Sequence, residues 1–106
     1  MRFYHNPRCS KSRQALALLE ERGCQLDVIR YLEDGVAPED ALAIAVHTNS
    51  VRPKDIPDGA DGDASTVEGR AELILAFPRC MERPVLINNG MAVIGRPPED
   101  VLTLLD

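Results

Sequence analysis

The sequence of 106 residues contains no tryptophan, and aromatic residues make up only 4% of it. Its core must therefore consist mainly of Leu, Val, Ile and Ala, and the 44% hydrophobic fraction is ordinary for a soluble globular protein. No apolar run approaches the ~20 residues that a membrane span needs, and the N-terminus lacks the apolar segment of a signal peptide. We expect a single domain over residues 1–106, cytoplasmic and monomeric.

Positive charge is also scarce, because the formal net charge is −5. This balance argues against nucleic acid or an acidic membrane as a partner, although a local basic cluster can still bind a small anion. The three cysteines, Cys9, Cys24 and Cys80, are odd in number and widely spaced. They are a poor disulfide framework and are typical of a reducing cytoplasm. We predict neither a metal site nor a bound cofactor.

Hydrophobic periodicity in the first third of the chain predicts a βαβ unit. A short strand over residues 2–5 precedes a helix over residues 11–22, which Gly23 ends, and a second strand follows over residues 25–31. Two strands joined through a helix pair in parallel with a right-handed crossover.

The rest of the chain reads as two helices, a hairpin and a last helix. Pro38 opens a helix to about residue 46, and Asp40 suits its positive end. A polar loop over residues 57–65 leads to a helix over residues 66–77. The strands 84–88 and 91–94 meet at an Asn-Gly turn, and Pro97 opens the last helix. The order βαβ-αα-ββα predicts an α/β fold with a mixed four-stranded sheet.

The clearest chemical signal lies at the start of the first helix. Cys9 follows the first strand and a turn at residues 6–7, so it stands where the helix begins. Free N–H groups and the positive helix end favour a thiolate and an oxyanion there. The neighbouring Arg8, Lys11 and Arg13 add positive charge. We predict that Cys9 is a reactive nucleophile.

Ser12 makes the motif C-x-x-S, so Cys9 cannot close the disulfide that C-x-x-C motifs form. Its side chain either hydrogen-bonds the thiolate, caps the helix, or does both. Cys24 lies ~20 Å from Cys9 at the far end of a helix, and we interpret Cys80 as a packed thiol. Cys9 therefore needs a resolving thiol from another molecule.

Two histidines and two arginines complete the candidate residues. His5, four residues before Cys9, either tunes the thiolate or has no role, and we interpret His47 as structural. Arg83 and Arg96 each precede a proline on either side of the hairpin. Arginine suits bidentate oxyanion binding, and a solvated surface charge is the alternative.

Residues 4–13, Y-H-N-P-R-C-S-K-S-R, resemble the Y-H-N-P-x-C-x-x-S-R opening of the glutaredoxin-linked arsenate reductases, a family grouped with the Spx regulators and the YffB-like proteins. Residues 31–33 (Y-L-E) resemble the end of a family strand. Residues 83–87 (R-P-V-L-I) resemble a second strand of the family, and residues 95–99 (G-R-P-P-E) resemble its G-x-R-P turn. The resemblance implies a thioredoxin-like fold with a helical insertion at about residues 38–77.

The resemblance also implies a mechanism and a role for each site residue. The Cys9 thiolate attacks arsenate at arsenic, glutathione as co-substrate attacks the resulting thiol–arsenate adduct, and glutaredoxin resolves the mixed species so that arsenite leaves. The implied catalytic residues are Cys9, His5, Ser12 and Arg13. The implied substrate-binding residues are Arg83, Arg96, Asn6 and Arg52. Pro84 is the implied cis-proline that faces the thiol.

The family carries a third oxyanion-binding arginine, whose position falls near Ile56; Arg52 and Lys54 are the candidates to replace it. Its absence favours a second hypothesis, a thiol oxidoreductase acting on glutathione, glutathionylated proteins or small thiols. A third hypothesis is a non-catalytic regulator like the Spx proteins, which engage RNA polymerase. Ser12 counts against it, because those regulators typically carry a C-x-x-C switch.

Overall fold

The computed structural model describes residues 1–105 and contains a four-stranded mixed sheet in the order β2-β1-β3-β4. Strand β1 (Arg2–Tyr4) pairs in parallel with β2 (Asp27–Ile29) and antiparallel with β3 (Val85–Asn88). Strand β3 forms a hairpin with β4 (Met91–Ile94). The predicted thioredoxin-like α/β fold is confirmed.

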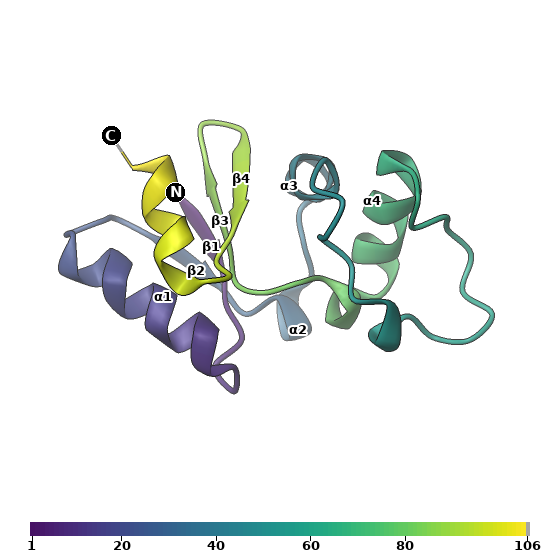
Figure 1. Cartoon of the computed structure of the whole chain (residues 1–106), viewed down its shortest axis with the longest axis horizontal. Coiled ribbons are helices and arrows are strands. Elements are labelled where there is room, and N and C mark those ends of the chain that lie inside the picture. The colour runs from purple at the N-terminus through teal and green to yellow at the C-terminus, as the bar shows by residue number, and fades with distance from the viewer. Residues whose placement is uncertain (106) are drawn as a thin grey trace.

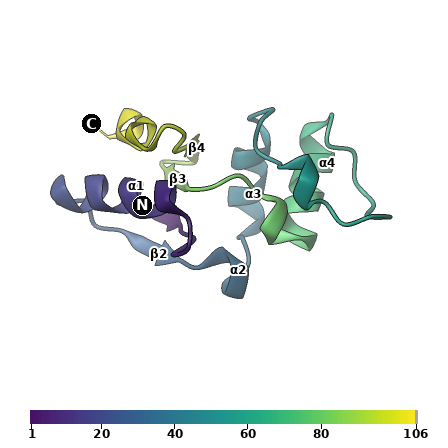
Figure 2. The ribbon, with the colours of Figure 1, turned by 60° about the horizontal axis from the view of Figure 1, so that its bottom comes forward.

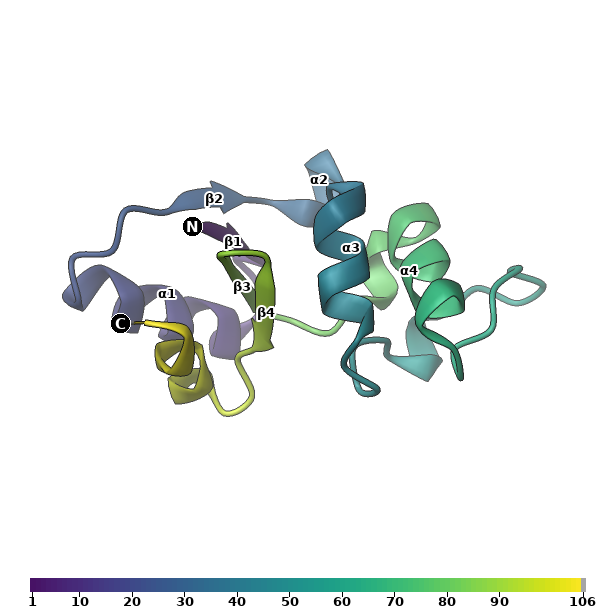
Figure 3. The same cartoon turned by 90° about the horizontal axis from the view of Figure 1, so that it is seen from above.

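The helices divide between two halves of an elongated molecule of 42 × 26 × 23 Å (Figures 1 and 2). They are α1 (Ser10–Glu21), α2 (Tyr31–Asp34), α3 (Pro38–Ala45) and α4 (Val67–Ala76), with 3₁₀ helices η1 (Pro53–Asp55), η2 (Pro78–Cys80) and η3 (Pro98–Leu104). Helices α1 and η3 lie with the sheet, whereas α3 and α4 lie side by side in the other half (Figure 3). Within residues 1–105 no helix is long and apolar enough to cross a membrane.

Strand alternation separates two hydrophobic cores on the two faces of the sheet. Phe3 and Leu86 are fully buried in a core with residues of α1 and η3. Tyr4 and Val85, their chain neighbours, are fully buried in a second core with residues of α3 and α4. The helical insertion is thus built onto the face of the sheet opposite α1.

Two buried charged residues fix the insertion, Asp40 to strand β1 and Arg70 within the insertion itself. Asp40, in the first turn of α3, is 2% exposed and receives two hydrogen bonds of 2.6 Å from Arg2 and one of 2.5 Å from the Tyr4 hydroxyl. Burial and the bond to Asp40 raise the pKa of Tyr4 to about 12. Arg70 of α4 is 5% exposed and donates to two backbone carbonyls at 2.8 and 2.9 Å.

The second strand is shorter than residues 25–31, because β1 offers only three residues to pair with. Pairing ends at Ile29, and residues 31–33, which resemble a strand end, instead start α2. The N–H groups of Glu33 and Asp34 both bond the Arg30 carbonyl, at 3.0 and 2.9 Å. This turn buries the side chain of the first α2 residue near the start of α1.

Candidate active site

Cys9 is the N-cap residue of α1, with an extended backbone and a half-buried side chain. Its N–H bonds the Asn6 carbonyl at 3.0 Å, which closes the turn between β1 and α1. Burial raises the pKa of the Cys9 thiol, but the backbone N–H of Ser12 and the Arg83 guanidinium lower it. A further N–H of the helix start and the charge of Arg96 act in the same direction, so the pKa lies below its usual value.

The Ser12 side chain is fully buried, and among the described residues it neither caps the helix nor hydrogen-bonds the Cys9 thiol. Its Oγ accepts a hydrogen bond from the Asn6 N–H at 3.0 Å and lies 2.6 Å from Nδ1 of His5. Both roles considered for this side chain, a bond to the thiolate and a helix cap, are therefore wrong. The backbone N–H of Ser12 acts on the thiol instead. The hydroxyl fixes the loop that carries Cys9.

His5 is 7% exposed at the end of β1. Burial lowers its pKa, and the charges of Arg30 and Arg13 lower it further, which favours the neutral ring. We assign its Nδ1 as acceptor of the Ser12 hydroxyl hydrogen. Arg13 itself donates from Nη1 to the Pro7 carbonyl at 2.8 Å. Both residues thus fix the loop that carries Cys9.

Arg83 and Arg96 converge on the thiol from the two sides of the hairpin. The Arg83–Pro84 and Arg96–Pro97 peptide bonds are both cis. Arg96 donates from Nη2 to the Cys9 Sγ at 3.5 Å and from Nε to the Arg83 carbonyl at 2.8 Å. The Arg83 Nε is buried and has no hydrogen-bond partner among the described residues. A free guanidinium donor beside a thiolate is suited to an anion.

Arg52 joins these two arginines, and we call the three the arginine cluster. One oxygen of Glu82 lies 3.2 Å from the Arg52 Nη1 and 3.1 Å from the Arg96 Nε. One oxygen of Asp55 lies 3.0 Å from the Arg52 Nε and 4.0 Å from the Arg83 Nη1. The arginine cluster and its two carboxylate partners together carry three positive and two negative charges.

A short antiparallel bridge places Arg52. Its N–H bonds the Cys80 carbonyl at 2.7 Å, and the N–H of Glu82 bonds the Ser50 carbonyl at 2.7 Å. Ile56, at the expected position of the third arginine, packs against the core instead. Lys54 lines a cleft of about 550 Å³ together with Arg52, Glu82 and Arg96.

Sequence reasoning did not assign Tyr31, Glu82 or Asp55 to the site. Tyr31 is 1% exposed; burial raises the pKa of its hydroxyl, and the Arg83 charge and an Asn6 hydrogen bond oppose this. For Tyr31 the available signal was its place in a family motif, and for Glu82 it was the position directly before the Arg-Pro pair. For Asp55 the only local signal is its spacing of three residues from Arg52.

The remaining candidates lie away from this chemistry. Cys80 is fully buried against the Leu73 carbonyl, and burial raises its pKa to about 11, which is the expected packed thiol. Cys24 packs beside the core under α1. His47 bonds the Ala92 carbonyl at 2.7 Å and so ties α3 to β4. In the part of the chain that the structure describes, no group of three His, Cys, Asp or Glu side chains could hold a metal ion.

Comparison with known proteins gives a consistent class. The model of the ArsC family matches residues 4–104. The uncharacterized protein YfgD of Escherichia coli is 40% identical over 99% of this chain and 96% of its own length, and a protein of Neisseria meningitidis named arsenate reductase is 36% identical over 99% and 97%. The solved structure of an arsenate reductase from Vibrio cholerae is 34% identical, with a TM-score of 0.70 over 99% of this chain and 98% of that one.

A family match over nearly the whole chain, together with relatives of this identity and coverage, identifies the class. The chain belongs to the ArsC family.

Proposed function

We propose that this protein is an arsenate reductase that uses Cys9 as its nucleophile and glutathione with glutaredoxin as its reductants. The observation that carries the proposal is the position of a low-pKa thiol 3.5 Å from the Arg96 guanidinium, within the arginine cluster. The names of the relatives at 36% and 34% identity support the substrate.

The arginine cluster supplies the charge that an oxyanion needs. The Arg83 Nε has no partner among the described residues, and the side chains of Arg52, Arg83 and Arg96 are only 31%, 22% and 34% exposed. Fixed donors in a partly dry site stabilise the charge that develops on the oxygens of arsenate during attack. In this proposal Arg52 replaces the third oxyanion-binding arginine of the family.

Two glutathione molecules supply the two electrons of the proposed reaction, and Cys9 is regenerated. The Cys9 thiolate displaces water from protonated arsenate and forms a sulfur–arsenic bond. The thiol of one glutathione then attacks the Cys9 sulfur, and the sulfur–arsenic bond breaks. Its two electrons stay with arsenic, which leaves as arsenite, and Cys9 and glutathione form a mixed disulfide. A further glutathione, helped by glutaredoxin, releases the Cys9 thiol and leaves oxidised glutathione.

A coupled assay tests the proposal directly. NADPH oxidation is followed with arsenate, glutathione, glutathione reductase and glutaredoxin, for the wild type and for Cys9→Ser. We expect arsenate-dependent turnover in the wild type only, and its loss when glutaredoxin is omitted. Turnover that survives in Cys9→Ser, or an inactive wild type, contradicts the proposal.

The two carboxylates paired with the arginine cluster favour a second candidate function, that of a thiol oxidoreductase that acts on glutathionylated proteins. Glu82 and Asp55 offset two of the three arginine charges, which weakens the attraction for a doubly charged oxyanion. This candidate predicts that the wild type releases glutathione from a glutathionylated protein through Cys9, while arsenate produces no turnover.

A further inference from the structure

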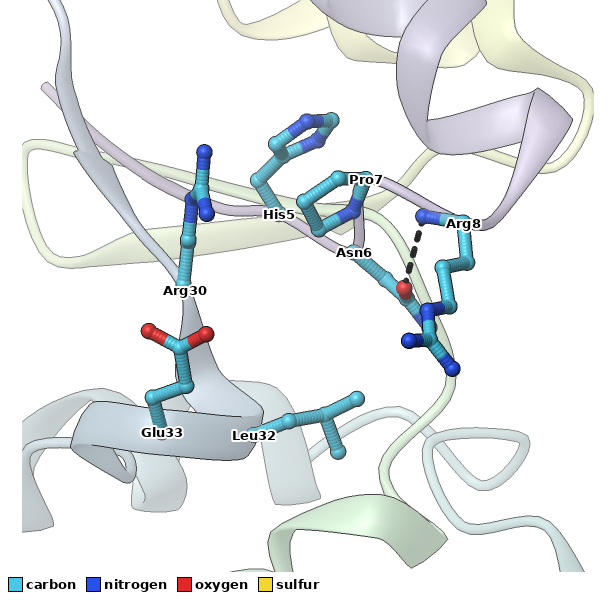
Figure 4. Close-up of a pocket in the computed structure, with 7 residues that line it drawn as sticks. All are labelled: His5, Asn6, Pro7, Arg8, Arg30, Leu32 and Glu33. Carbon is cyan, nitrogen blue, oxygen red and sulfur yellow. Dashed lines mark hydrogen bonds between the residues drawn. The ribbon is translucent and has the colours of Figure 1, made fainter.

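A second pocket lies beside the loop that carries Cys9. It has a volume of about 330 Å³ and is lined by residues 5–8 together with Arg30, Leu32 and Glu33 (Figure 4). It shares no lining residue with the cleft beside the arginine cluster. The mechanism proposed above leaves this pocket without a role.

Three charged side chains face the pocket without partners. Arg8, Arg30 and Glu33 form no ion pair and no side-chain hydrogen bond with any residue of the described chain. Figure 4 shows the Glu33 carboxylate and the Arg30 guanidinium on one side of the pocket and the Arg8 guanidinium on the other. Leu32, which is 51% exposed, also lines the pocket and lies between Glu33 and Arg8 in this view.

From this arrangement we infer that the pocket binds the charged groups of the thiol reductant, a peptide thiol with two carboxylates and one ammonium group such as glutathione. The two arginines match the two carboxylates, Glu33 matches the ammonium, and Leu32 offers an apolar surface to the chain between them. The inference rests on the proposed function and names the site of its co-substrate.

The pocket is within reach of the nucleophile. Arg8 directly precedes Cys9, and consecutive Cα atoms are about 3.8 Å apart. Tyr31, whose hydroxyl pKa is influenced by the Cys9 charge, directly precedes Leu32. An extended tripeptide spans about 10 Å, so a thiol held by its charged ends in the pocket can present its sulfur to Cys9.

Thiol–disulfide exchange tests this inference without arsenate. The Cys9 thiolate attacks one sulfur of a disulfide, forms a mixed disulfide and releases the other half as a thiolate. Rates are compared for oxidised glutathione, for 3,3′-dithiodipropionate, which has carboxylates but no ammonium, and for bis(2-hydroxyethyl) disulfide, which has neither. The last compound reports the intrinsic reactivity of Cys9 in each variant.

We expect Glu33→Gln to slow exchange about 3- to 10-fold with oxidised glutathione alone. Arg8→Gln and Arg30→Gln should slow it with both carboxylate-bearing disulfides, as a charge-assisted hydrogen bond is lost. Glu21→Gln and Arg22→Gln, exposed at the far end of α1, are the matched controls and should change none of the rates.

Equal slowing with all three disulfides, or the same loss in the control variants, overturns the inference. Its failure is distinguishable from failure of the proposed function. If the protein prefers oxidised glutathione through Glu33 but does not reduce arsenate, the pocket inference stands and the arsenate proposal is wrong. If it reduces arsenate without that preference, only the pocket inference is wrong.

Discussion

The insertion and the active site use the same kinds of charged residues in opposite ways. In the insertion, Asp40 and Arg70 are 2% and 5% exposed, and their polar groups meet fixed protein partners. In the arginine cluster, Arg83 and Arg96 are 22% and 34% exposed beside the thiol, and the Arg83 Nε has no partner among residues 1–105. Charged groups whose donors are paired stabilise the fold, whereas an unpaired guanidinium donor beside a thiol is suited to a ligand.

The two environments of the cysteines repeat this contrast. Burial raises the pKa of Cys80 to about 11, so its thiol stays protonated and inert. Cys9 is half-buried and burial raises its pKa as well, yet the N–H groups of the helix start and two arginines lower it overall. Reactivity therefore depends on which donors surround a thiol, and burial alone does not decide it.

The strongest test of this contrast is removal of each thiol. Cys9→Ser should reduce arsenate turnover in the coupled assay to background, because no other described thiol faces the arginine cluster. Cys80→Ala should retain turnover per folded molecule and lower only the free energy of unfolding. Loss of turnover in folded Cys80→Ala protein would contradict the assignment of Cys80 to the core.

The next largest effect is expected in the arginine cluster. Arg96→Gln or Arg83→Gln removes a charged hydrogen bond worth about 1.5–3 kcal/mol, which corresponds to a rise of roughly 10- to 100-fold in the KM for arsenate. The midpoint of urea unfolding should change little, because both side chains are partly exposed. Steady-state kinetics with unchanged KM in both variants would exclude them as oxyanion ligands.

Asp40→Ala should show the opposite pattern, a loss of stability without a change in KM. The Tyr4 hydroxyl loses its buried partner, which costs about 1–3 kcal/mol, whereas Arg2 is 41% exposed and can be solvated. Urea titration measures the change. Burial raises the pKa of Asp40, but its bonds to Arg2 and Tyr4 lower it below the ordinary value overall.

The pH dependence of this loss follows from that shift. A carboxyl whose pKa is lowered by folding contributes its full stability above the ordinary value of about 3.9. The contribution is lost as the pH falls through the folded pKa. The difference in the free energy of unfolding between wild type and Asp40→Ala should therefore be constant near neutral pH and become smaller below about pH 4. A difference that stays the same in acid would contradict the ion pair.

Glu82→Gln sharpens the comparison within the cluster itself. The Glu82 carboxylate lies within 3.2 Å of two arginines that an oxyanion would use, so its negative charge competes with arsenate for them. Removing its charge should lower the KM for arsenate by a few fold, about the scale of a partly exposed ion pair. Glu99→Gln, in the first turn of η3, serves as a control of equal charge change. A raised KM in Glu82→Gln would show instead that Glu82 chiefly positions Arg52 and Arg96.

The smallest expected effect is on the ionisation of Cys9. Alkylation by iodoacetamide follows the thiolate, so its pH midpoint in a Cys24→Ser background should lie below the ordinary thiol value of about 8.5. Arg96→Gln should move that midpoint to higher pH, because one source of the lowered pKa is removed. Lys54 lines the cleft but is not among the groups that act on the Cys9 pKa, so Lys54→Gln should leave the midpoint unchanged.

Local chain rules determined where Cys9 lies and much of the fold. The strand, turn and helix start at residues 2–12 follow from neighbours in the sequence, as does the Asn89–Gly90 turn, where both φ values are positive at 53° and 75°. The Arg83–Pro84 motif and the order of elements could likewise be assigned from the sequence. These features depend on interactions within a few residues, which a sequence pattern records directly.

Only the tertiary structure decided what the distant charged residues do. Asp40 reads as an ordinary helix-start residue, yet it is buried against Arg2, 38 positions away. Arg52 reaches the arginine cluster because a bridge pairs its segment with the residues before Arg83, and Glu82 then meets it 30 positions away. The sequence determines the charge of such a side chain, but its partners depend on chain segments that only the packed sheet and insertion bring together.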